Sequence, residues 1–348
     1  MKKYWWLFVI AAPALAVCMA GILVYYNMNI WKYEGSNIVF EVKQGEGFSR
    51  INGRLYKEGL ISNPKIFHRY AQINKLMTKF KAGKFKILKG SNMMDVFDVL
   101  LKGKSIAENI TIPEGKNLFE IAKVLKTKGI IKSISEFESL AKSSTFSQKL
   151  KINGERVEGY LYPDTYQFTK NSDPDSIIKT MVKVFKEKTK MLDFSSAPLG
   201  LTPHQVIILA SVVEKETGAA FERPRIAGVF LNRLKKKMRL QSDPTTIYGI
   251  YEQFNGNLRK KHLLEKTPYN TYKISGLPVG PIANPGIASI KAVLNPESHN
   301  FLYFVSQNDG THKFSKTYRE HRDAVEVYQK NASARRGKSW RDLNKRKQ

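Results

Sequence analysis

Cysteine is almost absent from this 348-residue sequence. The single Cys18 excludes an intramolecular disulfide and any metal site built from several cysteines. The six histidines are scattered, and the absence of a His-Glu-x-x-His pattern argues against a zinc hydrolase. We therefore expect no bound metal and no other cofactor.

Acidic residues are scarce as well. The chain has 30 Asp and Glu residues but 58 Lys and Arg residues, so the formal net charge is +28. Such a charge indicates an anionic partner, which could be nucleic acid, a phospholipid surface or an acidic polymer. Because the motifs of nucleic-acid-binding proteins are missing, we do not expect nucleic acid as a partner.

Charge is missing altogether from residues 4–31. The apolar part of this stretch is long enough to cross a bilayer, which takes roughly 20 helical residues. A cleaved signal peptide is the alternative, although the run is longer than a usual signal core. Lys2 and Lys3 should stay in the cytoplasm by the positive-inside rule. We therefore predict a single-pass anchor (residues 1–32) in the cell (inner) membrane, with the rest of the chain on the periplasmic or extracytoplasmic side, near the cell wall.

An internal repeat occupies the amino-terminal half. Residues 42–61 (VKQGEGFSRINGRLYKEGLI) align without gaps with residues 112–131 (IPEGKNLFEIAKVLKTKGII), at an offset of 70. Each unit has the pattern of a short strand, a glycine turn, an amphipathic helix and a glycine stop. We predict two small α+β modules, at residues 38–105 and 106–170, of which the first resembles a LysM-type glycan-binding domain. A chance recurrence of ordinary strand–helix patterning is the alternative.

An aromatic segment closes the second module. Residues 157–168 (VEGYLYPDTYQF) contain a Pro-Asp turn between aromatic residues. The segment is either a buried strand and turn or a loop that lines a sugar-binding groove, because aromatic rings stack on sugar rings. The sequence leaves both interpretations open.

The carboxyl-terminal half contains an unusual helix. Thr202 and Gln205 form a capping box around Pro203, and the helix continues through VIILASVVEKETG to Gly218. It is apolar almost all round, which predicts a buried helix, yet it ends in two glutamates. Glu216 shares a face with bulkier apolar residues than Glu214 does, and an apolar environment raises the pKa of a carboxyl towards the range of a general acid. A solvated helix end is the alternative interpretation.

Further elements follow this helix. We predict a helix at residues 223–240 with Arg233 and its neighbouring lysines facing outward, a polar turn at 241–245, and an ordered functional loop at 268–286. A β-hairpin with an Asn-Asp-Gly turn (residues 301–314) and a final helix (residues 318–330) come next. Residues 331–348 form a basic tail.

Six segments occur in an order that is specific to one family. They are LASVVEKET (209–217), VFLNR (229–233), RLQSDPT with YG (239–249), YNTY (269–272), GLPVGPIANPG (276–286) and LYFV (302–305). With EGYLYPDT (158–165), they make residues 39–330 strongly similar to the endolytic murein transglycosylase (YceG-like) family.

This resemblance implies an α+β enzyme with a catalytic domain at residues 171–330. Its catalytic glutamate matches Glu216, and the weaker pocket candidates that bind substrate are Gln241, Asp243, Tyr248, Asn270 and Tyr272. Members of the family cleave the MurNAc-GlcNAc bond of peptidoglycan glycan strands and leave 1,6-anhydro ends. The resemblance also suggests a link to the cell-wall synthesis machinery and a role in terminating glycan elongation.

Two other functions are weighed against this one. A non-catalytic, membrane-anchored peptidoglycan-binding scaffold would keep the repeat but would not need an acid at the end of a buried helix. A hydrolase would use two carboxylates, for instance Glu216 and Asp243, and would release a reducing end.

Overall fold

The computed structural model describes residues 5–43, 45–103 and 106–331, and the side chains of the first helix from Ile10 onward. It is a mixed structure of helices and small two-stranded sheets. The chain divides into two compact units, residues 1–109 with 167–172 and residues 110–166 with 173–348. The five-part division expected from the sequence stays a prediction. Lys2, Lys3 and residues 332–348 of the basic tail lie outside the described residues.

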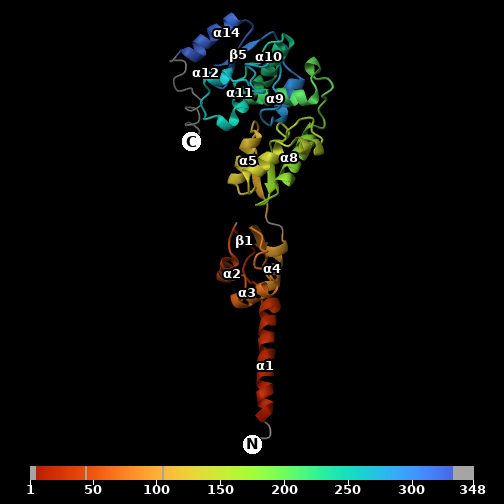
Figure 1. Cartoon of the computed structure of the whole chain (residues 1–348), viewed down its shortest axis with the longest axis vertical. Helices are drawn as coiled ribbons and strands as arrows, with labels where there is room; N and C mark the ends of the chain where they lie inside the picture. Colours follow the sequence, from red (N-terminus) through yellow and green to blue (C-terminus); the bar gives the residue numbers. More distant parts are fainter. Residues whose placement is uncertain (1–4, 44, 104–105, 332–348) are drawn as a thin grey trace. The chain divides into compact units, whose positions relative to one another are not determined.

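The first unit begins with a long apolar helix. Helix α1 (Trp5–Tyr25) continues into a π-helical turn, η1 (Tyr26–Ile30), and then into the small module (Figure 1). From Ile10 to Ile30 the mean hydropathy is 1.7, and only 6% of this segment is buried inside the protein. By length and composition it could cross a membrane, and its exposure is unlike that of a core helix.

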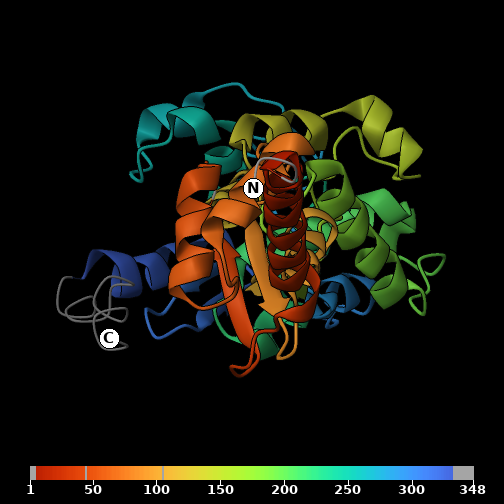
Figure 2. The same cartoon turned by 90° about the horizontal axis from the view of Figure 1, so that it is seen from below.

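The module of the first unit is built on one antiparallel strand pair. Strands β1 (Ile38–Val42) and β2 (Gly83–Ile87) pair with Phe40 opposite Phe85. Helix α4 (Met93–Lys102) packs on β2, and α2 (Phe48–Lys57) packs on α3 (Pro64–Ile73) (Figure 2, red to orange). Buried aromatic rings fill the space between these elements, since Phe67 and Phe97 stack with ring centroids 3.9 Å apart.

The same order of elements recurs 70 residues later. Strand β3 (Glu108–Thr111), helices α5 (Leu118–Thr127) and α6 (Ile134–Ala141), strand β4 (Thr165–Phe168) and helix α8 (Pro174–Thr189) follow one another, with α7 (Ser144–Lys149) inserted. Helix α5 begins and ends 70 residues after α2. Gly45 and Gly115 have nearly the same φ angle, 74° and 75°, in the left-handed region that suits glycine. This agreement supports the predicted repeat.

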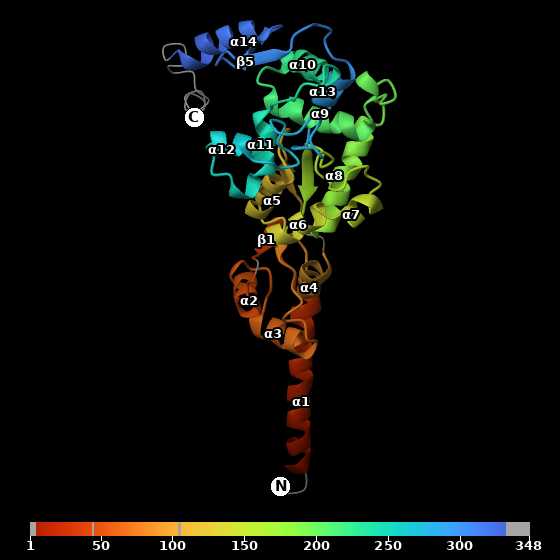
Figure 3. The ribbon, with the colours of Figure 1, turned by 45° about the horizontal axis from the view of Figure 1, so that its top comes forward.

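The carboxyl-terminal half of the second unit is mainly helical. Helix α9 (Pro203–Glu216) is buried from Val206 to Val213 and begins with the predicted capping box of Thr202 and Gln205. It packs against α10 (Arg223–Lys235) and α13 (Ile287–Leu294), and the three helices lie together in Figure 3. The remaining elements are η2 (Pro198–Gly200), η3 (Ala220–Glu222), α11 (Asp243–Gly249), η4 (Tyr251–Gln253), α12 (Lys260–Leu264), β5 (Tyr303–Ser306), β6 (His312–Ser315), α14 (Tyr318–Val325) and η5 (Glu326–Lys330).

Several local predictions are confirmed. Strands β5 and β6 form the expected hairpin, and the loop at 268–286 is ordered, with Asn270, Ile282 and Asn284 buried. The aromatic segment at 157–168 is largely buried, with Tyr160, Tyr162 and Tyr166 each less than 9% exposed. The interpretation as a buried segment is therefore confirmed for these three rings.

The predicted helix at 223–240 is wrong in two respects. Helix α10 ends at Lys235, and Lys237 adopts a positive φ of 54° that no α-helix continues through. Arg233 does not face outward, because it is only 8% exposed. Its guanidinium donates to the carbonyls of Leu302 and Leu240, which replace the water that a surface arginine would bind.

Candidate active site

The last turn of α9 directs its two glutamates to different surroundings. Glu214 Oε2 accepts hydrogen bonds from the Ser289 hydroxyl (2.7 Å) and the Gly286 backbone N–H (3.1 Å). Its other oxygen lies 3.4 Å from Arg223 Nη2, so the carboxylate is neutralised by a basic neighbour. Glu214 therefore ties α9 to the start of α13.

Glu216 lines a cavity of about 430 Å³. Its Oε1 accepts a hydrogen bond from the Ser242 hydroxyl, 2.5 Å away. The pKa of Glu216 is raised from 4.5 to about 7, because burial and the nearby Asp243 charge raise it by more than the Ser242 hydrogen bond and Arg233 lower it. A carboxyl that titrates near neutral pH can donate a proton and take one back, which is the requirement for general acid–base catalysis.

Arg233 lines the same cavity and was missed by the sequence reasoning. Its Nε donates to the Leu302 carbonyl (2.6 Å) and its Nη1 to the Leu240 carbonyl (2.8 Å), and the guanidinium lies over the Tyr303 ring at 5.1 Å. These contacts fix a positive charge beside the Glu216 carboxyl. Helical spacing contained the signal, because Arg233 follows Ile226 by seven residues and therefore belongs to the apolar stripe of its helix.

Three of the five weaker candidates line this cavity with Glu216. They are Gln241, Asp243 and Tyr272. The Tyr272 hydroxyl donates to Asp243 Oδ1 at 2.7 Å, which fixes both side chains. Gln241 has a positive φ of 52°, and its side-chain oxygen lies 3.5 Å from Arg233 Nη1.

The structure does not bring the other two candidates to the cavity. The Tyr248 hydroxyl donates to Glu158 at 2.9 Å, on another side of α11. Asn270 has no exposed surface. Its side chain bonds to the Thr246 hydroxyl and to the Glu265 carbonyl, so it shapes the loop rather than facing a ligand.

The carboxyl-terminal hairpin and helix form the rest of the cavity wall. Tyr303, Tyr318 and His321 line it together with the other residues of β5, Phe304 to Ser306. The Tyr303 and His321 rings stack with centroids 5.2 Å apart, and Tyr318 is 67% exposed. Aromatic rings in a cavity wall suit a sugar ligand. No local pattern in the sequence indicated that these residues would reach Glu216.

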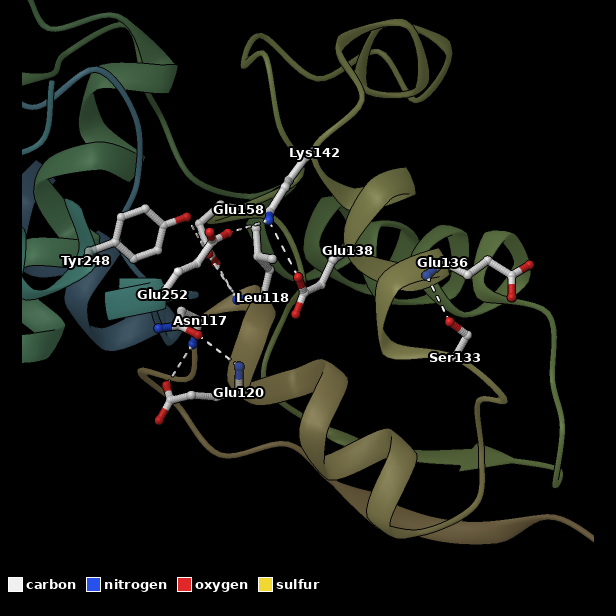
Figure 4. Close-up of polar contacts among 10 residues, drawn as sticks. All are labelled: Asn117, Leu118, Glu120, Ser133, Glu136, Glu138, Lys142, Glu158, Tyr248 and Glu252. Carbon is white, nitrogen blue, oxygen red and sulfur yellow. Dashed lines mark hydrogen bonds and ion pairs between the residues drawn. The ribbon is translucent and has the colours of Figure 1, made fainter. Parts of the chain in front are cut away.

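Another acid, the buried Glu158, lies outside this cavity in the same unit. Its carboxyl accepts hydrogen bonds from the Leu118 N–H (3.0 Å), the Tyr248 hydroxyl (2.9 Å) and the Asn284 side-chain amide (2.7 Å) (Figure 4 draws the first two). Burial raises the pKa of Glu158 to about 7, against the effect of these donors. Because donors surround it, Glu158 holds the start of α5, α11 and the loop at 268–286 together.

No group of three or more His, Cys, Asp or Glu side chains in the described ranges is placed to hold a metal ion.

Comparison with known proteins identifies a consistent set of relatives. The model of the YceG-like family matches residues 40–327. An endolytic murein transglycosylase of Bacillus subtilis (strain 168) is 33% identical over 314 residues, which cover 84% of this chain and 85% of that protein. One of Streptococcus pneumoniae (strain ATCC BAA-255 / R6) is 29% identical over 295 residues, 76% of this chain and 53% of that protein. A crystal structure of a putative yceG-like protein from Listeria monocytogenes shares 32% identity at a TM-score of 0.57, over 83% of this chain and 99% of that one.

Proposed function

The chain belongs to the YceG-like family, and from this premise we propose that it cuts peptidoglycan glycan strands as an endolytic murein transglycosylase, with Glu216 as its catalytic acid. One observation carries the residue assignment. Glu216 combines a pKa of about 7, a place in the cavity wall and, among the residues that the structure describes, one hydrogen-bond partner, Ser242. Glu214 is already bound to Arg223 and Ser289, so it is not available for proton transfer.

The proposed reaction uses one carboxyl twice. Protonated Glu216 gives its proton to the oxygen of the MurNAc-GlcNAc bond, and the bond between that oxygen and the muramyl anomeric carbon breaks. The muramyl 6-hydroxyl forms a new bond to the anomeric carbon, and its proton returns to the Glu216 carboxylate. The products are a free GlcNAc end and a 1,6-anhydro-MurNAc end, with no water consumed and the acid restored.

The neighbours of Glu216 support its two states. The Ser242 hydrogen bond orients the carboxyl and stabilises its charged form. Arg233 stabilises the carboxylate that remains after the first proton transfer, while the negative Asp243 favours the protonated form that begins the cycle. Burial, which is the largest cause, acts together with these opposed charges to place the pKa at about 7.

The other parts of the chain have roles that follow from the same proposal. The apolar segment from Ile10 to Ile30 anchors the protein in the cell (inner) membrane, with Lys2 and Lys3 in the cytoplasm and the catalytic unit on the side of the wall. Residues 38–105 act as a LysM-like glycan-binding module and residues 106–170 as a second module. A connection with the cell-wall synthesis machinery and a role in terminating strand elongation extend the proposal.

Mass spectrometry of digested sacculi tests the reaction. The full-length protein in detergent should release muropeptides with 1,6-anhydro ends, and Glu216→Gln should release none above background. Products with reducing ends would instead favour the hydrolase with Asp243 as second carboxylate, which needs the two carboxyls about 5 Å apart if it is retaining. Sacculus binding without any released product would favour the non-catalytic scaffold.

A further inference from the structure

Two smaller cavities lie at the far end of α11 from the candidate active site. They measure about 330 Å³ and 200 Å³, and Arg156, Pro268 and Tyr269 line both of them. Helix α11 has seven residues; Asp243 at its start lines the cavity of Glu216, and Gly249 at its end lines the larger of the two. At about 1.5 Å per residue, the cavity of Glu216 and the larger of these two cavities lie roughly 10 Å apart along the helix axis.

Aromatic rings form much of the wall of the larger cavity. Phe119 and Tyr251 stack with centroids 4.5 Å apart, and Tyr248 meets Tyr269 edge to face at 4.7 Å. Lys142 lies 4.5 Å above the Phe119 ring. The wall thus combines aromatic faces with two cationic side chains, Lys142 and Arg156, and one carboxylate, Glu252.

Most charged groups around these cavities already have partners. Lys142 Nζ lies 3.3 Å from Glu252 and 3.5 Å from Glu138, as Figure 4 shows. Glu158 is enclosed by hydrogen-bond donors. Glu155, which lines the smaller cavity, is exposed to solvent.

Arg156 and Tyr269 differ from these groups. Among the described residues, no hydrogen bond or ion pair engages the half-buried Arg156 guanidinium or the Tyr269 hydroxyl. A guanidinium presents donors in a planar fork that matches a carboxylate, and partial burial strengthens such a pair. A tyrosine hydroxyl beside it adds one further donor.

We propose that Arg156 and Tyr269 bind a carboxylate of the peptide stem that the substrate strand carries. This inference rests on the proposed function, because it assigns a second part of the same substrate to a second site. A stem attached to a muramyl residue near the cut bond has to cover only the length of α11 to reach Arg156. The aromatic wall then contacts the apolar side chains of the stem, and the enzyme prefers strands that keep their peptides.

Two substrates that differ only in their stems test the proposal. Glycan strands with intact stems are compared with strands from which an amidase has removed the stems, using the full-length protein in detergent. The unaltered chain should have the lower KM for strands with stems. Arg156→Gln should raise KM for these strands about tenfold or more, which is the usual effect of losing a charge-assisted hydrogen bond. The KM ratio, defined as KM for strands without stems divided by KM for strands with stems, should therefore fall towards one. Arg156→Lys should restore part of the ratio.

Lys128→Gln is the matched control, since it removes one positive charge from the same unit at an exposed position that lines neither cavity. It should keep the KM ratio of the unaltered chain. If Arg156→Gln fails to fold, as judged by circular dichroism, Tyr269→Phe removes a single hydroxyl and should lower the ratio in the same direction. Equal KM values for the two substrates in the unaltered chain, or an equal rise of both in Arg156→Gln, would overturn the proposal.

A binding measurement separates this proposal from the proposed function. Calorimetric titration with a soluble disaccharide peptide should give binding that Arg156→Gln weakens about tenfold and Lys128→Gln leaves in place. If the unaltered chain cuts neither substrate but shows this pattern, the proposed function fails and the peptide site stands. If it cuts strands but no binding of the peptide depends on Arg156, the peptide site fails alone.

Discussion

Replacement of Glu216 by Gln separates the catalytic role of this residue from its effect on stability. Glutamine has nearly the same size, and its side-chain oxygen can still accept the hydrogen bond that Ser242 donates over 2.5 Å. The proton that titrates is lost. General acid–base catalysis contributes roughly 10²–10⁴-fold, so we expect activity on sacculi to fall by at least about 10²-fold.

The same change should stabilise the protein at high pH. The pKa of Glu216 rises from 4.5 to about 7, a shift of about 2.5 units, and each unit corresponds to about 1.4 kcal/mol. Between these two values the unfolded chain has lost the proton while the folded chain keeps it, so the folded protein loses stability as the pH rises to 7. The loss, up to about 3 kcal/mol, persists above pH 7 and is absent from the glutamine variant.

Thermal unfolding of the full-length protein in detergent measures this difference. We compare the melting temperature of the variant with that of the unaltered chain at each pH. The difference in favour of the variant should be roughly 5–10 °C larger at pH 8 than at pH 4.5, for a unit of this size. Glu214→Gln is the matched control, because the same substitution two residues earlier affects a carboxyl outside the cavity, and its activity should fall by less than about tenfold. A Glu216→Gln variant that keeps full activity, or whose difference in melting temperature does not depend on pH, would refute the reasoning.

Two further predictions follow from named hydrogen bonds, and a third from the apolar segment at the amino terminus. Ser242→Ala removes a hydrogen bond that lowers the pKa of Glu216, so the decline of kcat/KM above pH 7 should move to higher pH. If this decline stays at the same pH or moves to lower pH, the Ser242 hydrogen bond does not set the titration of Glu216. Glu158→Gln places an amide N–H₂ among the hydrogen-bond donors of Leu118, Tyr248 and Asn284, so it should lower the free energy of unfolding by about 1–3 kcal/mol. An unchanged midpoint of denaturant unfolding would contradict the view that three donors surround this carboxyl. A reporter fused after Lys330 should be active only outside the cytoplasm, and cytoplasmic activity would overturn the proposed orientation.

Several local elements of this protein could be predicted from short stretches of its sequence. The missing charge in residues 4–31 predicted the apolar helix, and the residues Thr202, Pro203 and Gln205 predicted the start of α9. The Asn-Asp-Gly turn predicted the hairpin of β5 and β6, and the 70-residue offset predicted the recurrence of α2 as α5. Each of these features depends on turn chemistry, capping or periodicity within a short stretch of chain, which a sequence shows directly.

The surroundings of the two glutamates of α9 depend on contacts between distant parts of the chain. Glu214 meets Ser289 and Glu216 meets Ser242, and both partners come from segments far along the chain. The burial of Arg233 depends on carbonyls of residues 240 and 302, and the cavity wall depends on a hairpin and helix beyond residue 300. Tyr248 and Asn270 were placed in the pocket by resemblance, but packing directs them to other partners. Side-chain environment depends on which distant segments pack together, and no local pattern specifies that.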